Sequence, residues 1–171
     1  TQGVTRDDQR ILTRVIDAGC GFGILANKWD LVVGSRASRK TEATMADAVK
    51  RAAAFASFAP IMAVSAQTGF QVMRGLTRAL EVARRQRTGL SDRDTAVILQ
   101  RAWTRQPPPR VHGRLARFQQ ARWVPGRPIR VSVTTAPKSL LPLGYQRYLI
   151  KQLHADSRCA GIPLRLRVNE P

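Results

Sequence analysis

Two short apolar segments, separated by an alanine-rich stretch, constrain the fold of this 171-residue chain more than any other feature. The first is FGILA, residues 22–26, and the second is the run PIMAVSA that Pro60 opens. Each segment is too short for a helix and is bounded by glycine or polar residues, as strands are. Because residues 41–58 between them have a helical period, the two strands are predicted to be parallel, as in a strand–helix–strand unit.

Helical patterns flank both strands. Residues 5–18 begin with Thr5 and two acids, as a capped helix does, and have an apolar face made of Ile11, Leu12, Val15 and Ile16. Residues 69–87 have an apolar face that is expected to point inward and consists of Val72, Leu76, Ala79, Leu80 and Ala83. The order helix, strand, helix, strand, helix predicts an α/β layer with a parallel sheet over residues 1–87.

The pattern changes near Gly89, and residues 88–171 are predicted to form a separate small α+β unit. Ser91 is expected to cap a helix over residues 92–106, with Asp94 as its capping-box partner, and three prolines end that helix. Two strand-like runs, a helix and a last strand follow, with the approximate bounds 114–123, 128–135, 142–155 and 162–168. In the second run apolar and polar residues alternate, so one face of this sheet is expected to be buried and the other wet.

The charge of the chain indicates a polyanionic partner. Lys and Arg number 29 against 11 acids, a formal net charge of +18, and all but five of the basic residues are arginine. The planar guanidinium suits phosphate oxygens, so nucleic acid is the expected partner, and a solvated Arg-rich surface without a partner is the alternative. Trp123 is expected to stack on a base. The candidate RNA-binding residues are Arg110, Arg114, Arg117, Arg122, Arg127, Arg130, Lys138, Arg147, Lys151, Arg165 and Arg167.

Other kinds of site find little support in the sequence. Cys20 and Cys159 lie far apart and His112 and His154 are isolated, so no metal site is predicted and the thiols are expected to be reduced, as in an intracellular protein. No apolar run approaches the roughly 18 residues of a membrane span, so no membrane association is expected.

Polar residues follow both predicted strands of the first unit. The tetrapeptide NKWD, residues 27–30, comes directly after the first strand, and SAQ, residues 65–67, ends the second. Because the carboxyl ends of parallel strands meet at one edge, where α/β sheets bind ligands, these loops are expected to lie together. The alternative is a polar turn and a helix cap, since a motif with three fixed positions also occurs by chance.

Guanine is the ligand that such a pair of loops fits. Asp30 is expected to accept hydrogen bonds from N1–H and the exocyclic amine of the base, a donor pair that adenine lacks. Asn27 is expected to hold the loop and reach N7, and the Lys28 stem to lie over the base. The Ala66 N–H is expected to point at the carbonyl oxygen of guanine, with Ser65 steadying the first loop. The predicted guanine-binding set is Asn27, Lys28, Asp30, Ser65, Ala66 and Gln67.

The two loops are similar to the fourth and fifth guanine-nucleotide motifs of translation-factor-type GTPases, and the wider sequence resembles the Der (EngA) family. GVTRDDQRIL resembles part of the second GTPase domain of that family, and NKWDLV is its preferred form of the motif. The segments that resemble its C-terminal KH-like domain are QPPPRVHGRLARFQQARWVPGRPIRVSV, LLPLGYQRYLIKQL and GIPLRLRV. The resemblance implies the C-terminal half of a P-loop-GTPase-type parallel sheet in residues 1–87 and a KH-like domain in residues 88–171.

For function, the resemblance implies a GTPase of ribosome assembly that binds GTP or GDP, large-subunit ribosomal RNA and ribosomal proteins. Mg²⁺ is implied only together with a phosphate-binding loop, and the sequence contains no Gly-x-x-x-x-Gly-Lys-Ser/Thr. The chain alone is therefore expected not to hydrolyse GTP and to be part of a longer or split protein. The Gly-x-x-Gly clamp that KH domains use on single-stranded RNA is also missing from the sequence.

Several function classes remain open in the sequence. The first is the C-terminal portion of a ribosome-assembly GTPase. The second is a non-enzymatic ribosomal or RNA-binding component that has lost its phosphate-binding half, and the third is a module whose KH-like face docks another GTPase domain. The expected location is intracellular and ribosome-associated, in the bacterial cytoplasm or in a mitochondrial or plastid matrix, and the arginine content favours an organelle.

Overall fold

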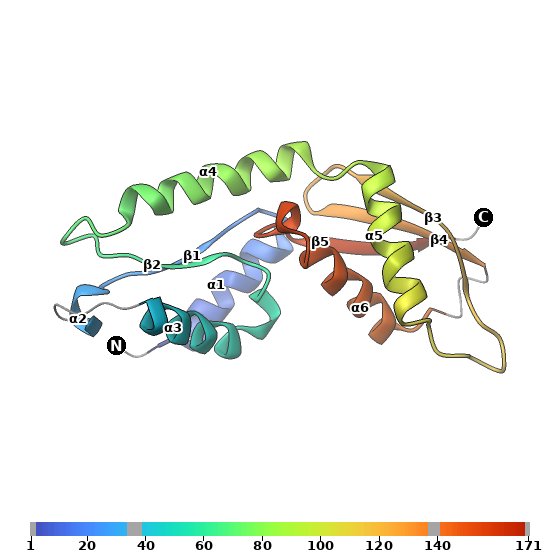
Figure 1. Cartoon of the computed structure of the whole chain (residues 1–171), viewed down its shortest axis with the longest axis horizontal. Coiled ribbons are helices and arrows are strands. Elements are labelled where there is room, and N and C mark those ends of the chain that lie inside the picture. Colours follow the sequence, from blue (N-terminus) through green and yellow to red (C-terminus); the bar gives the residue numbers. More distant parts are fainter. Residues whose placement is uncertain (1–2, 34–38, 137–140, 170–171) are drawn as a thin grey trace.

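Two β-sheets lie one after the other along the long axis of the protein, each with helices packed on it (Figure 1). This computed structural model describes residues 3–33, 39–136 and 141–169. The two-stranded sheet pairs β1 (Ile24–Ala26) with β2 (Ile61–Ala63) in parallel. The three-stranded sheet has the order β3-β4-β5, in which β4 is antiparallel to β3 and parallel to β5. The predicted α/β class is confirmed.

The elements follow the predicted order, apart from a short helix at Asp30–Val33, which was not predicted. The helices are α1 (Arg6–Asp17), α2 (Asp30–Val33), α3 (Arg39–Ala52), α4 (Val72–Thr88), α5 (Asp92–Arg105) and α6 (Leu143–His154), with 3₁₀ turns at Ala54–Ala56 and Ser157–Cys159. The strands of the larger sheet are β3 (Arg117–Val124), β4 (Ile129–Ala136) and β5 (Leu164–Asn169). The helix predicted up to residue 58 ends at Ala52, because the chain tightens into a 3₁₀ turn before it enters β2. None of the described helices is long and apolar enough to cross a membrane.

Two helix starts show how local sequence sets the ends of elements. At α1 the Thr5 side chain accepts a hydrogen bond from the Asp8 N–H, and the Asp8 carboxylate accepts one from the Thr5 N–H, a complete capping box. At α5 the Ser91 hydroxyl accepts from the Asp94 N–H at 3.0 Å, as expected. The reciprocal half of that predicted box is replaced, because the Asp94 carboxylate accepts from Arg158, 2.8 Å away.

The two-stranded sheet lies between α4 on one side and α1 and α3 on the other (Figure 1). α4 comes close to β1 because Gly75 has no side chain, and a Cβ there would lie 3.3 Å from the Leu25 methyl groups. Val82 is the other buried residue of this helix. A small residue and a valine therefore make the inner face of α4.

The inward face predicted for α4 is wrong. Leu76 and Leu80 are 54% and 72% exposed, and β1, predicted to be buried, leaves Leu25 50% exposed. Both differences have one cause: among the described residues this sheet has only two strands, so the helix face and the strand extend past the edge of the sheet. Ile11 of α1 is exposed for the same reason.

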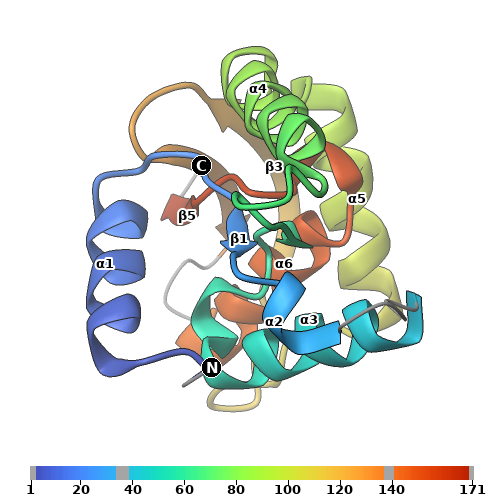
Figure 2. The same cartoon turned by 90° about the vertical axis from the view of Figure 1, so that its left-hand side faces the viewer.

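The main hydrophobic core lies between the three-stranded sheet and the helices α5 and α6, which cover one of its faces (Figure 2). Leu99 of α5, Leu149 of α6 and Val131 of β4 are fully buried there. The alternation predicted for β4 is confirmed, with apolar residues inward and Arg130 outward. The core thus leaves the second face of the sheet free for polar side chains.

Gly161 hydrogen-bonds to both segments that lead into the two-stranded sheet. The Gly161 N–H donates to the Phe58 carbonyl, and its carbonyl accepts from the Phe22 N–H, both at 2.9 Å. Phe22 precedes β1 and Phe58 precedes β2, so both strands start next to one residue of the segment that leads into β5. Gly161 has a φ of +80°, and a Cβ there would lie only 2.6 Å from the Phe22 carbonyl oxygen. Beside it, the His154 ring stacks on Phe58 with centroids 4.4 Å apart.

Candidate functional site

The two polar loops meet at the carboxyl ends of β1 and β2. Asn27 Oδ1 accepts hydrogen bonds from the Ala66 N–H at 3.1 Å and from the Lys28 N–H at 2.7 Å. The Ser65 hydroxyl donates to Asp30 Oδ1 at 2.5 Å. Two hydrogen bonds between the loops, Asn27 to Ala66 and Asp30 to Ser65, therefore fix an amide and a carboxylate at one edge of the sheet.

The backbone of the first loop turns sharply. Lys28 has a φ of +65°, in the left-handed region that non-glycine residues rarely adopt. The turn buries Trp29, whose backbone N–H donates to the Val64 carbonyl at 3.1 Å, and α2 begins at Asp30. Strain of this kind persists where the surroundings over-determine it and is concentrated at ligand sites.

The second loop is held by more groups than the sequence predicts. The buried Ser65 donates its N–H to the Phe70 carbonyl at 3.0 Å, and its Oγ accepts from the Thr68 N–H at 3.2 Å. Thr68 and Phe70 therefore shape the site although the predicted set omits them. The signal that points to them is the hydroxyl of Ser65 ahead of a Thr-Gly pair, which is typical of a side-chain-stabilised turn.

The loops present groups that suit the polar edge of guanine. Asp30 is half-buried, Ser65 holds one of its oxygens, and an ionised carboxylate accepts several hydrogen bonds. Asn27, Lys28 and Gln67 are exposed around it. The Ala66 N–H donates to Asn27 in this structure, so its contact with the guanine carbonyl oxygen stays a prediction and requires this N–H to share or change its acceptor.

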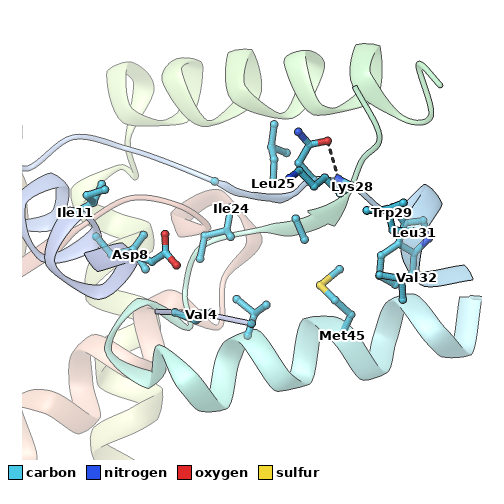
Figure 3. A pocket seen from close by; sticks show the side chains of 16 residues that line it. Val4, Asp8, Ile11, Ile24, Leu25, Lys28, Trp29, Leu31, Val32 and Met45 are labelled. Atoms are coloured by element: carbon cyan, nitrogen blue, oxygen red, sulfur yellow. Dashed lines mark hydrogen bonds between the residues drawn. The ribbon is translucent and has the colours of Figure 1, made fainter. Parts of the chain in front are cut away.

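A pocket of about 720 Å³ lies next to the loops, between α1, β1 and α3 (Figure 3). Ile11, Leu31 and Met45 are among its apolar lining residues. Of the predicted guanine set only Asn27 and Lys28 reach its wall. The pocket thus suits apolar side chains and adjoins the polar edge where the base is expected, with which it shares these two residues.

The residues present do not fit a triphosphate or Mg²⁺. The hydroxyl and lysine of a phosphate-binding loop are missing from the sequence. Within the part of the chain that the structure describes, no group of three His, Cys, Asp or Glu side chains is placed to hold a metal ion. The described loops therefore offer groups that suit a base and none that would hold a metal-bound triphosphate.

The strand register gathers five of the candidate arginines on the uncovered face of the three-stranded sheet. Arg130 pairs with Arg165, and Arg122 and Arg167 lie on either side of Ser132. These four side chains are exposed, and so is that of Arg117 at the start of β3. We call this set of five residues the arginine face: Arg117, Arg122, Arg130, Arg165 and Arg167.

The remaining RNA-binding candidates do not join this face. They are Arg110 and Arg114 in the loop before β3, Arg127 in the β3–β4 turn, Arg147 and Lys151 one turn apart on α6, and Lys138, which lies outside the described residues. Arg110 donates within its own loop, to the Gly113 carbonyl at 3.1 Å. The structure therefore concentrates the predicted charge in one patch and leaves the rest dispersed.

The expectation that Trp123 stacks on a base is wrong. Its side chain belongs to the hydrophobic core and is 8% exposed. Trp123 shares the inner face of β3 with Ala121, whereas Arg122 between them points outward. A Cβ on Gly89 would lie 2.2 Å from the Trp123 indole nitrogen, so the ring is packed against the end of α4.

Comparison with known proteins identifies similar chains. Residues 93–169 match the family described as the KH-domain-like domain of EngA bacterial GTPase enzymes, C-terminal. The chain is 33% identical over 168 residues to GTPase Der of Desulforudis audaxviator, an alignment that covers 97% of this chain and 37% of that protein. It is 27% identical over 170 residues to GTPase Der of Caldicellulosiruptor saccharolyticus, covering 99% of this chain and 38% of that protein.

These similarities confirm the resemblance to the Der (EngA) family and the KH-like fold of the second unit. The chain spans about a third of the length of the curated relatives it matches. The division of the chain at residues 87 and 88 and the roles of the individual site residues stay predictions.

Proposed function

Because this chain belongs to the Der (EngA) family, whose KH-like domain its residues 93–169 match, we propose that it is the guanine-recognising, RNA-binding portion of a ribosome-assembly GTPase. GTP hydrolysis with Mg²⁺ is proposed for a longer protein in which further strands carry the phosphate-binding loop. Large-subunit ribosomal RNA and ribosomal proteins are the proposed partners. An intracellular, ribosome-associated location follows from this proposal.

The observation that carries the guanine proposal is the pair of side-chain hydrogen bonds between the loops. A polar turn has no need of a second loop, yet Asn27 binds Ala66 and Asp30 binds Ser65, 39 and 35 residues further along the chain. Both bonds hold the groups that a base edge needs, an amide and a carboxylate, in fixed positions before any ligand arrives. Such preorganisation favours a binding site over a solvated turn.

The open edge of β1 supports the proposal of further strands. The Ile24 N–H donates to Pro60 and the Ala26 carbonyl accepts from Val64, both at 2.9 Å, so these two residues turn their backbone toward β2. Leu25 between them therefore presents its N–H and carbonyl at the opposite edge. A strand added there would cover Leu25 and the exposed face of α4.

The substitution Asp30→Asn tests the guanine site. Guanosine monophosphate is expected to shift the amide NMR signals of the Asn27 and Ala66 loops, and adenosine monophosphate is not. In Asp30→Asn, guanosine affinity should fall at least about tenfold, since hydrogen bonds to a charged group contribute about 1.5–3 kcal/mol. The affinity for xanthosine monophosphate should rise, because the amide of the variant donates a hydrogen bond where the carboxylate accepted one.

The matched control is Asp47→Asn, which removes the same charge from an exposed position on α3. It should leave the guanosine response unchanged. An equal response to guanosine and adenosine, or no change in base preference in Asp30→Asn, would make Asp30 a turn residue.

The second function, a non-enzymatic RNA-binding component, is supported by the arginine face alone. The two proposals differ in the guanosine response, because a pure RNA-binding module has no use for the preorganised loops. They agree on the arginine face.

A further inference from the structure

The register of the three-stranded sheet sorts its residues into two chemically different faces. The inner face carries the aromatic residues of β3, Phe118 and Trp123, which pack in or against the core. On the outer face, the polar positions between the arginines are Gln120, Ser132, Thr134 and Asn169. Tyrosine, phenylalanine and tryptophan are thus missing from the outer positions of the described strands.

From this arrangement we infer that the arginine face binds the phosphate backbone of double-stranded RNA and does not bind unpaired bases. The inference deepens the proposed function and rests on its RNA-binding part. Proteins that hold single-stranded RNA commonly stack its bases on an aromatic platform, to which arginine planes can add, or clamp its backbone with a Gly-x-x-Gly loop. The arginine face offers neither device.

Four of the five arginines form a compact two-row array, whereas Arg117 lies apart, opposite Ala136 at the other end of β4. Arg130 and Arg165 are paired on neighbouring strands, about 4.8 Å apart by sheet geometry. Arg122 and Arg167 flank Ser132, the next outward-facing position of β4, which lies about 7 Å from Arg130 along the strand. Guanidinium groups at this density and on a rigid sheet match a rigid ligand with closely spaced phosphates, which is what a duplex provides.

Few of the acidic residues that the structure describes lie close enough to neutralise the positive charge of the arginine face. Of the acidic residues that the structure describes, Asp17 at the end of α1 forms the one ion pair with the arginine face, to Arg165 at 3.1 Å. That pair is more than half exposed and contributes little. The Asp17–Arg165 pair lies where the end of α1 meets the sheet. Arg117, Arg122 and Arg130 lie farther from α1, on β3 and β4.

The test compares a 16-base-pair RNA duplex with its separated strands by fluorescence anisotropy over a salt series, with residues 1–171. The duplex should bind at least about tenfold more tightly than either strand, and a second duplex of different sequence should bind equally well. The triple variant Arg122→Gln, Arg130→Gln, Arg167→Gln should bind the duplex at least about tenfold more weakly. Its log–log salt slope should flatten by about two to three, since each lost phosphate contact removes about 0.9.

The control is the triple variant Arg93→Gln, Arg101→Gln, Arg105→Gln. It removes the same charge from exposed positions on α5, on the covered side of the sheet, and should stay within about threefold of the wild type. Single strands that bind as tightly as the duplex, or a control that loses as much as the test variant, would overturn the inference but leave RNA binding intact. Binding to neither RNA would overturn the RNA-binding part of the proposed function itself.

Discussion

His154 links the pH to the stability of the junction between the two sheets. Its Nε2 lies 2.9 Å from the Ile162 carbonyl oxygen, as an Nε2–H donor would, and burial lowers the pKa of the ring below its ordinary value of 6.5. Because the unfolded chain takes up this proton more readily, the free energy of unfolding should fall as the pH drops below about 6.5 and be fully retained above it. Urea denaturation at pH 5.0, 6.0 and 7.5 measures this. His154→Gln should reduce the dependence; the same dependence in the variant would assign it to other groups.

The exposed face of α4 and the buried face of α6 should respond differently to substitution. Leu80→Gln should change the free energy of unfolding by less than about 0.5 kcal/mol, because the side chain is largely in water. Leu149→Ala should cost about 2–5 kcal/mol, because Leu149 is fully buried and leaves a cavity. Equilibrium urea unfolding at low protein concentration compares the two. A loss at Leu80 as large as at Leu149 would mean that another surface covers α4 in solution.

We expect the stability of the protein as a whole to depend on the contact at Gly161. Gly161→Ala should lower the free energy of unfolding by about 2 kcal/mol or more, since alanine disfavours its positive φ and the added Cβ would meet the Phe22 carbonyl oxygen. Gly144→Ala is the control: this glycine lies within α6 with nothing within 4 Å, so alanine should be neutral or stabilise by up to about 1 kcal/mol. Denaturant titration followed by tryptophan fluorescence measures both. Equal stability of Gly161→Ala and wild type would show that the two sheets do not depend on this contact.

Local chemistry allowed much of the fold to be predicted from the sequence by itself. Capping residues and breakers located the starts of α1 and α5, and two-residue alternation predicted which face of β4 is buried. The positions of the two polar loops were likewise predictable, because a polar motif directly after a strand is a local signal. All of these depend on neighbours within a few residues along the chain.

The tertiary structure alone decided which side chains are buried and which arginines lie together, because both depend on segments that are distant in sequence. The apolar face of α4 stays exposed, since the described sheet beneath it has two strands, and the outward direction of Arg122 places Trp123 in the core. The pairing of β4 with β5 brings Arg130 beside Arg165, 35 residues further along the chain. Strand register, which no local pattern specifies across such a separation, thus determined which of the many arginines lie together on one face.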